Sequence, residues 1–158
     1  EIRYLREDKR MGTAGALSLL PERPSLPLLV TNADLLTTVD YADLLDAHQS
    51  SGAWATMAVR EYEYQIPFGV VRAEEETITG LEEKPVHRAL VNAGIYALSP
   101  QALDHVPQDS FFDMPELFER LLEAGHPARC HPVHGYWLDI GRHEDLRRAN
   151  EDFPGVFR

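Results

Sequence analysis

The sequence predicts an α/β fold in which a mixed, mostly parallel sheet is flanked by helices. Two patterns carry this prediction. Strand-like apolar runs alternate with helix-like segments early in the chain, and a hairpin pattern follows them. Size agrees, because 158 residues with 44% hydrophobic side chains suit one globular domain with a core.

Helix-start and helix-stop residues mark the elements of the N-terminal part. Asp40 is a typical N-cap residue, apolar residues then recur at helical spacing, and Gly52 is suited to end that helix. A short apolar run that ends in a turn indicates a buried strand before it. In order, we expect a strand at 2–6, a helix at 13–20, a strand at 27–31 and a helix from 40 to about 51.

Strand-like runs fill the middle of the chain, where a charged turn separates two of them. Glu74, Glu75 and Glu76 form that turn, so the runs on either side are expected to pair as a hairpin. The expected strands lie at 53–60, 68–73, 77–82 and 91–98.

The C-terminal part begins with a clear helix-start signal. Asp113 is followed by Pro115 and then by Glu116, which stands three residues after the cap, and Gly125 ends this helix. The predicted order is completed by strands at 128–133 and 136–138 and a helix at 143–152.

Composition argues against several classes of function. The formal net charge of -11 disfavours nucleic-acid binding, which normally needs a basic face. No apolar stretch approaches the roughly 20 residues of a membrane span, and the N-terminus lacks the apolar region of a signal peptide. A single cysteine, Cys130, rules out an internal disulfide and is compatible with the cytoplasmic location that we expect. Because the chain does not begin with Met, we expect a fragment or a processed product.

Two aspartates lie where strands are expected to end. Asp34 follows the apolar run at 26–30, and Asp139 follows residues 135–138. Carboxylates at such strand ends lie in the crevice where open α/β sheets bind ligands. Since Mg²⁺ is often held by one or two carboxylates together with substrate phosphates, we predict that this pair binds Mg²⁺. Taken singly, either aspartate could instead be a helix cap or a turn former.

Three other segments are candidates for ligand binding. The loop at 11–16 is flexible enough to approach a flat ring or a phosphate, although its glycines would also allow tight packing. Lys84, beside Glu82 and Glu83, is suited to a phosphate, and the Asn92 amide can donate to and accept from sugar hydroxyls. The structural alternatives are a solvated hairpin end and an ordinary strand-edge hydrogen bond.

The segment that holds His126, Cys130, His131 and His134 has residue types found in zinc sites. Cys130 and His131 are neighbours on an expected strand and point to opposite faces, so a four-ligand site is difficult to close. We therefore do not predict zinc. No nucleophile-elbow pattern surrounds any serine either.

Six short motifs occur in the same order as in the sugar-1-phosphate nucleotidyltransferases, also called nucleotide-sugar pyrophosphorylases. They lie at residues 12–16, 32–35, 68–71, 83–85, 92–96 and 137–141. The chain most resembles the group around mannose-1-phosphate guanylyltransferase and glucose-1-phosphate thymidylyl- or uridylyltransferase. The resemblance implies a Rossmann-like sheet of the nucleotide-diphospho-sugar transferase type, with residues 1–158 as a single nucleotidyltransferase domain.

The resemblance also implies a reaction and a role for each motif. In that family the sugar phosphate oxygen attacks the α-phosphorus of a nucleoside triphosphate and pyrophosphate leaves, while Mg²⁺ withdraws negative charge. Asp34 and Asp139 would hold Mg²⁺ and, with Lys84 on the sugar phosphate, form the catalytic set. The nucleotide would contact Gly12, Thr13, Gly15 and Asn32, the sugar would contact Gly69, Glu83 and Asn92, and Trp137 would pack beneath the site.

The chain departs from the family pattern in two places. Ala33 stands where the family usually has Gly, while Asp34 is retained. The family's catalytic domain also begins with a strand and a Gly-rich loop that carries Arg and Lys, whereas this chain begins at what resembles the third strand. The resemblance therefore covers the C-terminal two-thirds of that domain, and the fold is expected to be N-terminally truncated.

The second departure leads to two expectations. Because the missing loop supplies cations to the triphosphate, we expect no appreciable transferase activity from the chain alone. Because neighbouring strands are missing, the strand at 27–31 would have an open edge, which predicts strand exchange, a homodimer or a displaced N-terminal segment.

Two other functions remain open. A nucleotide-sugar-dependent glycosyltransferase could share the fold and a metal-binding Asp34, although a second acid would normally stand at the place of Asn32. A non-catalytic module that binds a nucleotide-sugar or another protein is the second alternative. The sequence leaves open which base and which sugar are bound.

Overall fold

Four strands form the central sheet of the computed structural model, which describes residues 1–157. The order across the sheet is β1 (Leu28–Thr31), β6 (Val86–Leu98), β3 (Ala55–Gln65) and β7 (Ala128–Pro132). β3 and β7 are parallel, whereas β6 is antiparallel to both of its neighbours. Three strands therefore run one way and one runs the other, which confirms the predicted mixed sheet.

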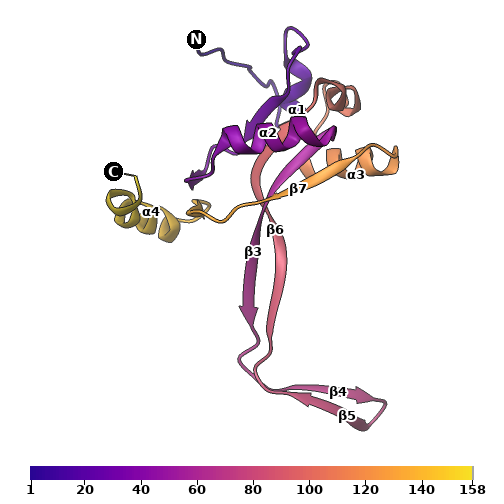
Figure 1. The fold of residues 1–158 in the computed structure, drawn as a ribbon, viewed down its shortest axis with the longest axis vertical. Helices are drawn as coiled ribbons and strands as arrows, with labels where there is room; N and C mark the ends of the chain where they lie inside the picture. Colours follow the sequence, from indigo (N-terminus) through magenta and orange to yellow (C-terminus); the bar gives the residue numbers. More distant parts are fainter. Residues whose placement is uncertain (158) are drawn as a thin grey trace.

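Helices cover both faces of this sheet. Because side chains alternate along a strand, neighbouring residues of β6 enter two different apolar clusters. Tyr96 packs in one cluster with α3 (Met114–Glu123), and Ile95 packs in the other with Leu44 of α2 (Tyr41–Ser51). The sheet is thus the middle layer between two helices, with a core on each side (Figure 1).

The starts of both helices are set by residues that the sequence indicated. The Asp40 carboxylate accepts hydrogen bonds of 2.9 and 3.1 Å from backbone amides in the first turn of α2. At the start of α3, the backbone amide of Asp113 donates to Oε2 of Glu116 at 2.7 Å. Gly52, with φ of 65°, follows the last residue of α2. These predictions are confirmed.

A two-stranded ribbon extends from the sheet and ends in a hairpin (Figure 1). β3 and β6 stay paired as far as Gln65 and Val86, beyond the strand limits that we expected. β4 (Val70–Glu74) and β5 (Thr77–Glu82) then pair as the predicted hairpin. The length of these two strands was not apparent from the sequence, because charged and aromatic residues alternate in this part of the ribbon. Both of its faces are exposed, as at Tyr62, so no apolar face marks it as a strand.

A second, smaller sheet joins two parts of the chain that are far apart in sequence. β2 (Leu35–Thr37) and β8 (Trp137–Asp139) are antiparallel, with Leu36 opposite Leu138. β2 was not expected, because a strand of this length directly after a turn carries too little periodicity. α4 (His143–Val156) follows β8 and continues past the expected end near residue 152.

The N-terminal segment corrects one expectation. The alternation at residues 2–6 predicted a strand, but these residues are in no strand, and the side chains of Ile2 and Tyr4 are 81% and 86% exposed. A strand needs a neighbour for its backbone hydrogen bonds, and no paired strand lies beside this segment within residues 1–157. The sequence predicted strand exchange, a homodimer or a displaced N-terminal segment. The exposed, unpaired residues 2–6 match the displaced segment.

Shorter helices complete the fold. The helix expected at 13–20 is divided into α1 (Gly12–Gly15) and a 3₁₀ helix, η1 (Ala16–Leu19). Another 3₁₀ helix, η2 (Pro100–His105), follows β6 and was not expected. Within the described part of the chain, no helix combines the length and the apolar character needed to cross a membrane.

Candidate active site

A bulge in β6 positions both aspartate segments. The register between β3 and β6 shifts where Met57 lies opposite Tyr96 and Val59 lies opposite Asn92. In this interval β6 has two more residues than β3, and Gly94 adopts a φ of 72° there. The carbonyl of Gly94 accepts a 2.8 Å hydrogen bond from the backbone amide of Asn32. The bulge thereby holds the end of β1.

The same bulge holds β8. The indole Nε1 of Trp137 donates a 2.8 Å hydrogen bond to the carbonyl of Ala93, and the Trp137 ring packs against the apolar cluster around Ile95. The guanidinium carbon of Arg60 lies 5.9 Å from the centre of that ring. Trp137 therefore packs under the site, in the role that the resemblance implied.

Pairing of β2 with β8 places Asp34 and Asp139 on adjacent segments. Leu35 lies opposite Asp139, and the backbone amide of Ile140 donates a 2.8 Å hydrogen bond to the carbonyl of Asp34. Both aspartates are exposed, so their carboxylates are accessible to a ligand. The structure thus brings together two residues that are more than a hundred positions apart in sequence.

The glycine loop, which we define as residues 11–15, is fixed against the segment before α3. The backbone amides of Ala14 and Gly15 donate to the carbonyl of Phe112 at 3.0 and 2.9 Å, and the amide of Phe112 donates to the carbonyl of Met11 at 2.9 Å. A Cβ atom on Gly15 would lie only 2.7 Å from the carbonyl oxygen of Ser110. Tight packing therefore accounts for this glycine.

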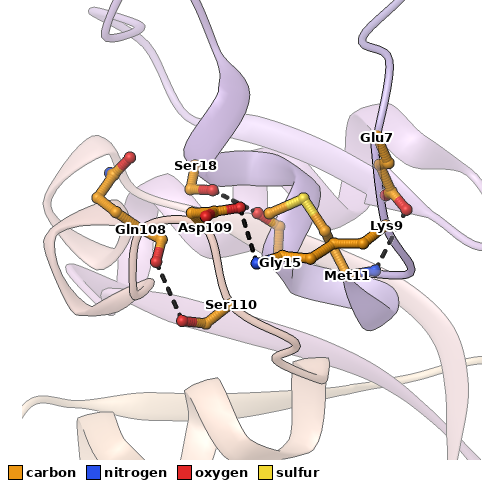
Figure 2. Close-up of polar contacts among 8 residues, drawn as sticks. All are labelled: Glu7, Lys9, Met11, Gly15, Ser18, Gln108, Asp109 and Ser110. Atoms are coloured by element: carbon orange, nitrogen blue, oxygen red, sulfur yellow. Dashed lines mark hydrogen bonds and ion pairs between the residues drawn. The ribbon is translucent and has the colours of Figure 1, made fainter.

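Side chains around the glycine loop hold it on two further sides (Figure 2). Lys9 Nζ lies 3.0 Å from Oδ1 of Asp109 in the turn before α3. Glu7 Oε2 accepts a 3.3 Å hydrogen bond from the backbone amide of Met11. Ser18 Oγ donates to the carbonyl of Gly15 at 2.7 Å. The loop is thus held from the N-terminal segment and from the segment that leads into α3.

An open hollow of about 640 Å³ lies between the glycine loop and the end of β1. Its lining residues are Glu7, Gly12, Thr13, Thr31, Asn32, Ala33 and Asp34. Three of the predicted nucleotide-binding residues and one predicted metal ligand therefore share one surface. Gly15 is buried and is not among the lining residues.

The predicted sugar-binding residues are divided between two places. Gly69, Glu83 and Lys84 lie where the ribbon meets the hairpin, and a Cβ atom on Gly69 would lie 3.0 Å from Oε2 of Glu83. Asn92 instead lies beside the bulge. Along β6, the distance from Val86 to the bulge is ~25 Å at ~3.3 Å per residue. The structure does not bring Lys84 to the hollow, and its contact with a sugar phosphate stays a prediction.

Asn92 uses its amide within the protein. Its Oδ1 accepts a 2.9 Å hydrogen bond from the backbone amide of Gly94, and its Nδ2 donates to the hydroxyl of Tyr96 at 2.8 Å. Burial raises the pKa of Tyr96, and the hydrogen bond from Asn92 opposes that rise. Asn92 therefore stabilises the bulge, and its contact with a sugar stays a prediction.

Two histidines of the disfavoured zinc segment are engaged in separate contacts. The His126 ring stacks on Trp54 with 3.6 Å between ring centres. Nε2 of His131 lies 3.4 Å from Oδ2 of Asp43 on α2. Within residues 1–157, no group of three or more His, Cys, Asp or Glu residues is arranged to hold a metal ion.

A model of the nucleotidyl transferase family matches residues 1–154 of the chain. The match includes the glycine loop, both aspartate segments, the ribbon and the hairpin. The chain belongs to the nucleotidyl transferase family.

Relatives of this nucleotidyl transferase chain agree with that membership. It is 32% identical over 152 residues to the mannose-1-phosphate guanylyltransferase catalytic subunit beta of Dictyostelium discoideum. It is 29% identical over 153 residues to the mannose-1-phosphate guanyltransferase of Candida albicans. Each match covers 92% of this chain and 42% of the relative, so the chain spans less than half the length of these curated relatives.

Solved structures share the fold of the nucleotidyl transferase chain. HddC from Yersinia pseudotuberculosis superposes with a TM-score of 0.63 at 21% sequence identity, covering 93% of this chain and 64% of HddC. HddC complexed with GMP-PN gives the same TM-score at 20% identity. At this level of identity, the likeness supports the mixed sheet with flanking helices.

The sequence motifs did not indicate two residues at this candidate site. Glu7 lines the hollow, but an isolated carboxylate in a charged segment gives no signal of this position. Asp113 was expected only as a helix cap. Its Oδ1 also accepts hydrogen bonds from Thr13, which no local pattern could indicate because the partners are distant in sequence.

Proposed function

We propose that this chain provides the metal-binding and nucleotide-contacting part of a sugar-1-phosphate nucleotidyltransferase. The observation that carries the proposal is that Asp34 lines a hollow together with Gly12, Thr13 and Asn32, while pairing of β2 with β8 brings the segment of Asp139 next to it. In the proposed reaction, an oxygen of the sugar phosphate forms a bond to the α-phosphorus of a nucleoside triphosphate. The bond from that phosphorus to the β-phosphate oxygen breaks, and pyrophosphate leaves.

The side chains of the two aspartates are of the type that binds Mg²⁺. Both are exposed carboxylates on paired segments, and Mg²⁺ is commonly held by one or two carboxylates together with substrate phosphates. When bound, the ion would neutralise charge on the phosphates. Asp34 and Asp139 would orient the phosphates, while the glycine loop would border the base through its backbone.

The proposed substrates are a guanine nucleotide and mannose 1-phosphate. The names of the Dictyostelium and Candida relatives support both, and the HddC complex with GMP-PN supports a nucleotide at this fold. Gly69, Glu83, Lys84 and Asn92 are proposed to contact the sugar phosphate. For Gly69, Glu83 and Lys84, this requires the hairpin to approach the hollow. A cytoplasmic location and a homodimer through exposed strand edges, such as that of β1, are also proposed.

Ligand binding is the property to test in this chain, because the chain covers only 42% of the length of the Dictyostelium relative. Titration calorimetry with GTP and with GDP-mannose, each with and without Mg²⁺, is expected to show Mg²⁺-dependent binding. Asp34→Asn and Asp139→Asn should remove the Mg²⁺ dependence, and Asp46→Asn, an exposed carboxylate on α2, should not. Failure of both ligands to bind would contradict the proposal.

Product analysis separates the alternative functions. GTP, mannose 1-phosphate and Mg²⁺ should yield pyrophosphate in the whole protein that carries this chain, whereas we expect no appreciable turnover by the 158-residue chain alone. Release of a nucleoside diphosphate from GDP-mannose would instead indicate a glycosyltransferase. Binding of GDP-mannose by a whole protein that yields neither product would indicate a non-catalytic module.

A further inference from the structure

We propose that Asp113 is a positioning residue that holds the glycine loop in the conformation that receives the nucleotide. This inference rests on the proposed function, since it assigns a role to the loop that borders the base. It concerns a residue that lies outside the six motifs that carry the resemblance and outside the lining of the hollow.

The contacts of Asp113 join the glycine loop to α3. One carboxylate oxygen, Oδ1, accepts hydrogen bonds from the backbone amide of Thr13 at 2.8 Å and from its hydroxyl at 3.0 Å. The hydroxyl of Thr13 accepts in turn from the backbone amide of Met114 at 2.8 Å. Thr13 therefore satisfies an amide at the start of α3, and Asp113 fixes both the backbone and the side chain of Thr13.

The capping box that Asp113 forms with Glu116 at the start of α3 accounts for only part of this arrangement. A capping carboxylate accepts from amides in the first turn of its own helix. Here Oδ1 of Asp113 also accepts from two donors in a loop a hundred residues away, and the Thr13 hydroxyl accepts from a further amide at the start of the helix. Hydrogen bonds to a charged acceptor are stronger than neutral ones, so the carboxylate orients the loop more firmly than a neutral group would.

The loop held in this way is the part that faces the hollow. Gly12 and Thr13 line it together with Asn32 and Asp34. Gly12 has a φ of 77°, and a Cβ atom there would lie 2.8 Å from Oδ1 of Asp113. The carboxylate is thus packed directly against the loop backbone. Its removal would free the Thr13 amide and hydroxyl and let this wall of the hollow change shape.

Asp113 also lies near the residues that hold the β6 bulge. Tyr96 is buried, and its hydroxyl accepts a hydrogen bond from Asn92. Burial raises the pKa of Tyr96 most, and the negative charge of Asp113 adds to the rise. Asp113 thus bonds the glycine loop, and its neighbours Phe112 and Met114 pack in the same apolar cluster as Tyr96, which supports a role in joining the two walls of the site.

The test measures GTP binding in the presence of Mg²⁺ together with amide hydrogen exchange at residues 13–15. Asp113→Ala is expected to raise the Kd for GTP about tenfold and to speed exchange at Thr13, since hydrogen bonds to a charged group are lost. Thr13→Val should act in the same direction, and Thr13→Ser, which keeps the hydroxyl, should restore binding. Asp113→Asn, which keeps an acceptor, should have the smaller effect of the two Asp113 variants.

Asp40→Ala is the matched control, because it removes a carboxylate from the start of α2 without contact to the loop. It should lower thermal stability but leave the Kd for GTP within twofold. If wild type binds GTP and both Asp113→Ala and Thr13→Val bind it equally well, the positioning role is wrong while the proposed function stands. If wild type binds neither GTP nor GDP-mannose, the proposed function is wrong and this inference falls with it; if it binds GDP-mannose alone, the same variants are compared with that ligand. If Asp113→Ala does not fold, Thr13→Val and Thr13→Ser decide between these outcomes.

Discussion

The backbone amide of Asn32 donates a 2.8 Å hydrogen bond to the carbonyl of Gly94, and this contact fixes the end of β1 on the bulge of β6. The contact continues the β1–β6 register by one residue, at a position where Gly94 has a φ of 72°, which residues with a side chain rarely adopt. A Cβ atom at this position would lie 2.9 Å from Nδ2 of Asn32 and 3.1 Å from Cδ1 of Leu35. The start of β2, and with it Asp34, therefore depends on the absence of a side chain at residue 94.

Gly94→Ala is expected to destabilise the protein by roughly 2–3 kcal/mol, from left-handed backbone strain and from displacement of its neighbours. Gly52→Ala is the matched control, because Gly52 has a similar φ of 65° but open space around its Cβ position. It should cost only about 1 kcal/mol. Urea unfolding at neutral pH measures both, and equal losses would show that the contact with Asn32 adds nothing.

Neutralising the aspartate pair should affect ligand binding without affecting stability. Asp34 and Asp139 are exposed, so Asp34→Asn and Asp139→Asn are expected to change the free energy of unfolding by less than about 0.5 kcal/mol. The increase in melting temperature caused by GTP with Mg²⁺ should disappear in both variants, because ligand-induced stabilisation follows the affinity. A full increase in both variants would contradict a shared metal site.

Stability is expected to fall at mildly acidic pH because of His48. Its Nδ1 lies 2.8 Å from Thr56 Oγ1 and its Nε2 lies 3.0 Å from Ser99 Oγ, and burial lowers its pKa below the ordinary value of 6.5. As the pH falls below 6.5, the unfolded state takes up this proton before the folded state does. The free energy of unfolding therefore decreases from pH 6.5 down to the lower folded pKa.

The control for this pH dependence is a comparison of two histidine variants. His48→Gln should remove much of the slope of unfolding free energy against pH between 6.5 and 5. His143→Gln, at the exposed start of α4, should leave that slope unchanged. Urea unfolding at several pH values measures the slope, and an unchanged slope in His48→Gln would assign it to other groups.

Trp137→Phe tests how firmly β8 is attached to the bulge. The change keeps most of the apolar packing but removes the 2.8 Å hydrogen bond from Nε1 to the carbonyl of Ala93. A loss of about 1–2 kcal/mol is expected, because Ala93 is fully buried and its carbonyl would lose a donor. Chemical denaturation measures the loss, and hydrogen exchange in residues 137–139 should quicken more than exchange in α2.

Sequence patterns predicted the elements whose hydrogen bonds are local. The Asp40 cap, the pairing of Asp113 with Glu116 at the start of α3, and the hairpin around Glu75 are each made by residues close together in the chain. The same local reasoning failed at residues 2–6. Alternation there indicated a strand, but only a neighbouring strand can satisfy its backbone, and local sequence does not reveal that neighbour.

The sequence by itself determined the family, the helix starts and the two aspartates at strand ends, because motifs and caps depend on short stretches of chain. Only the tertiary structure decided which of these residues meet. Pairing of β2 with β8 places Asp34 beside Asp139, and the bulge at Gly94 holds both segments. The ribbon places Lys84 away from them, and Asp113 contacts the glycine loop. Long-range pairing sets such contacts through register and bulges, and periodicity in the sequence does not encode them.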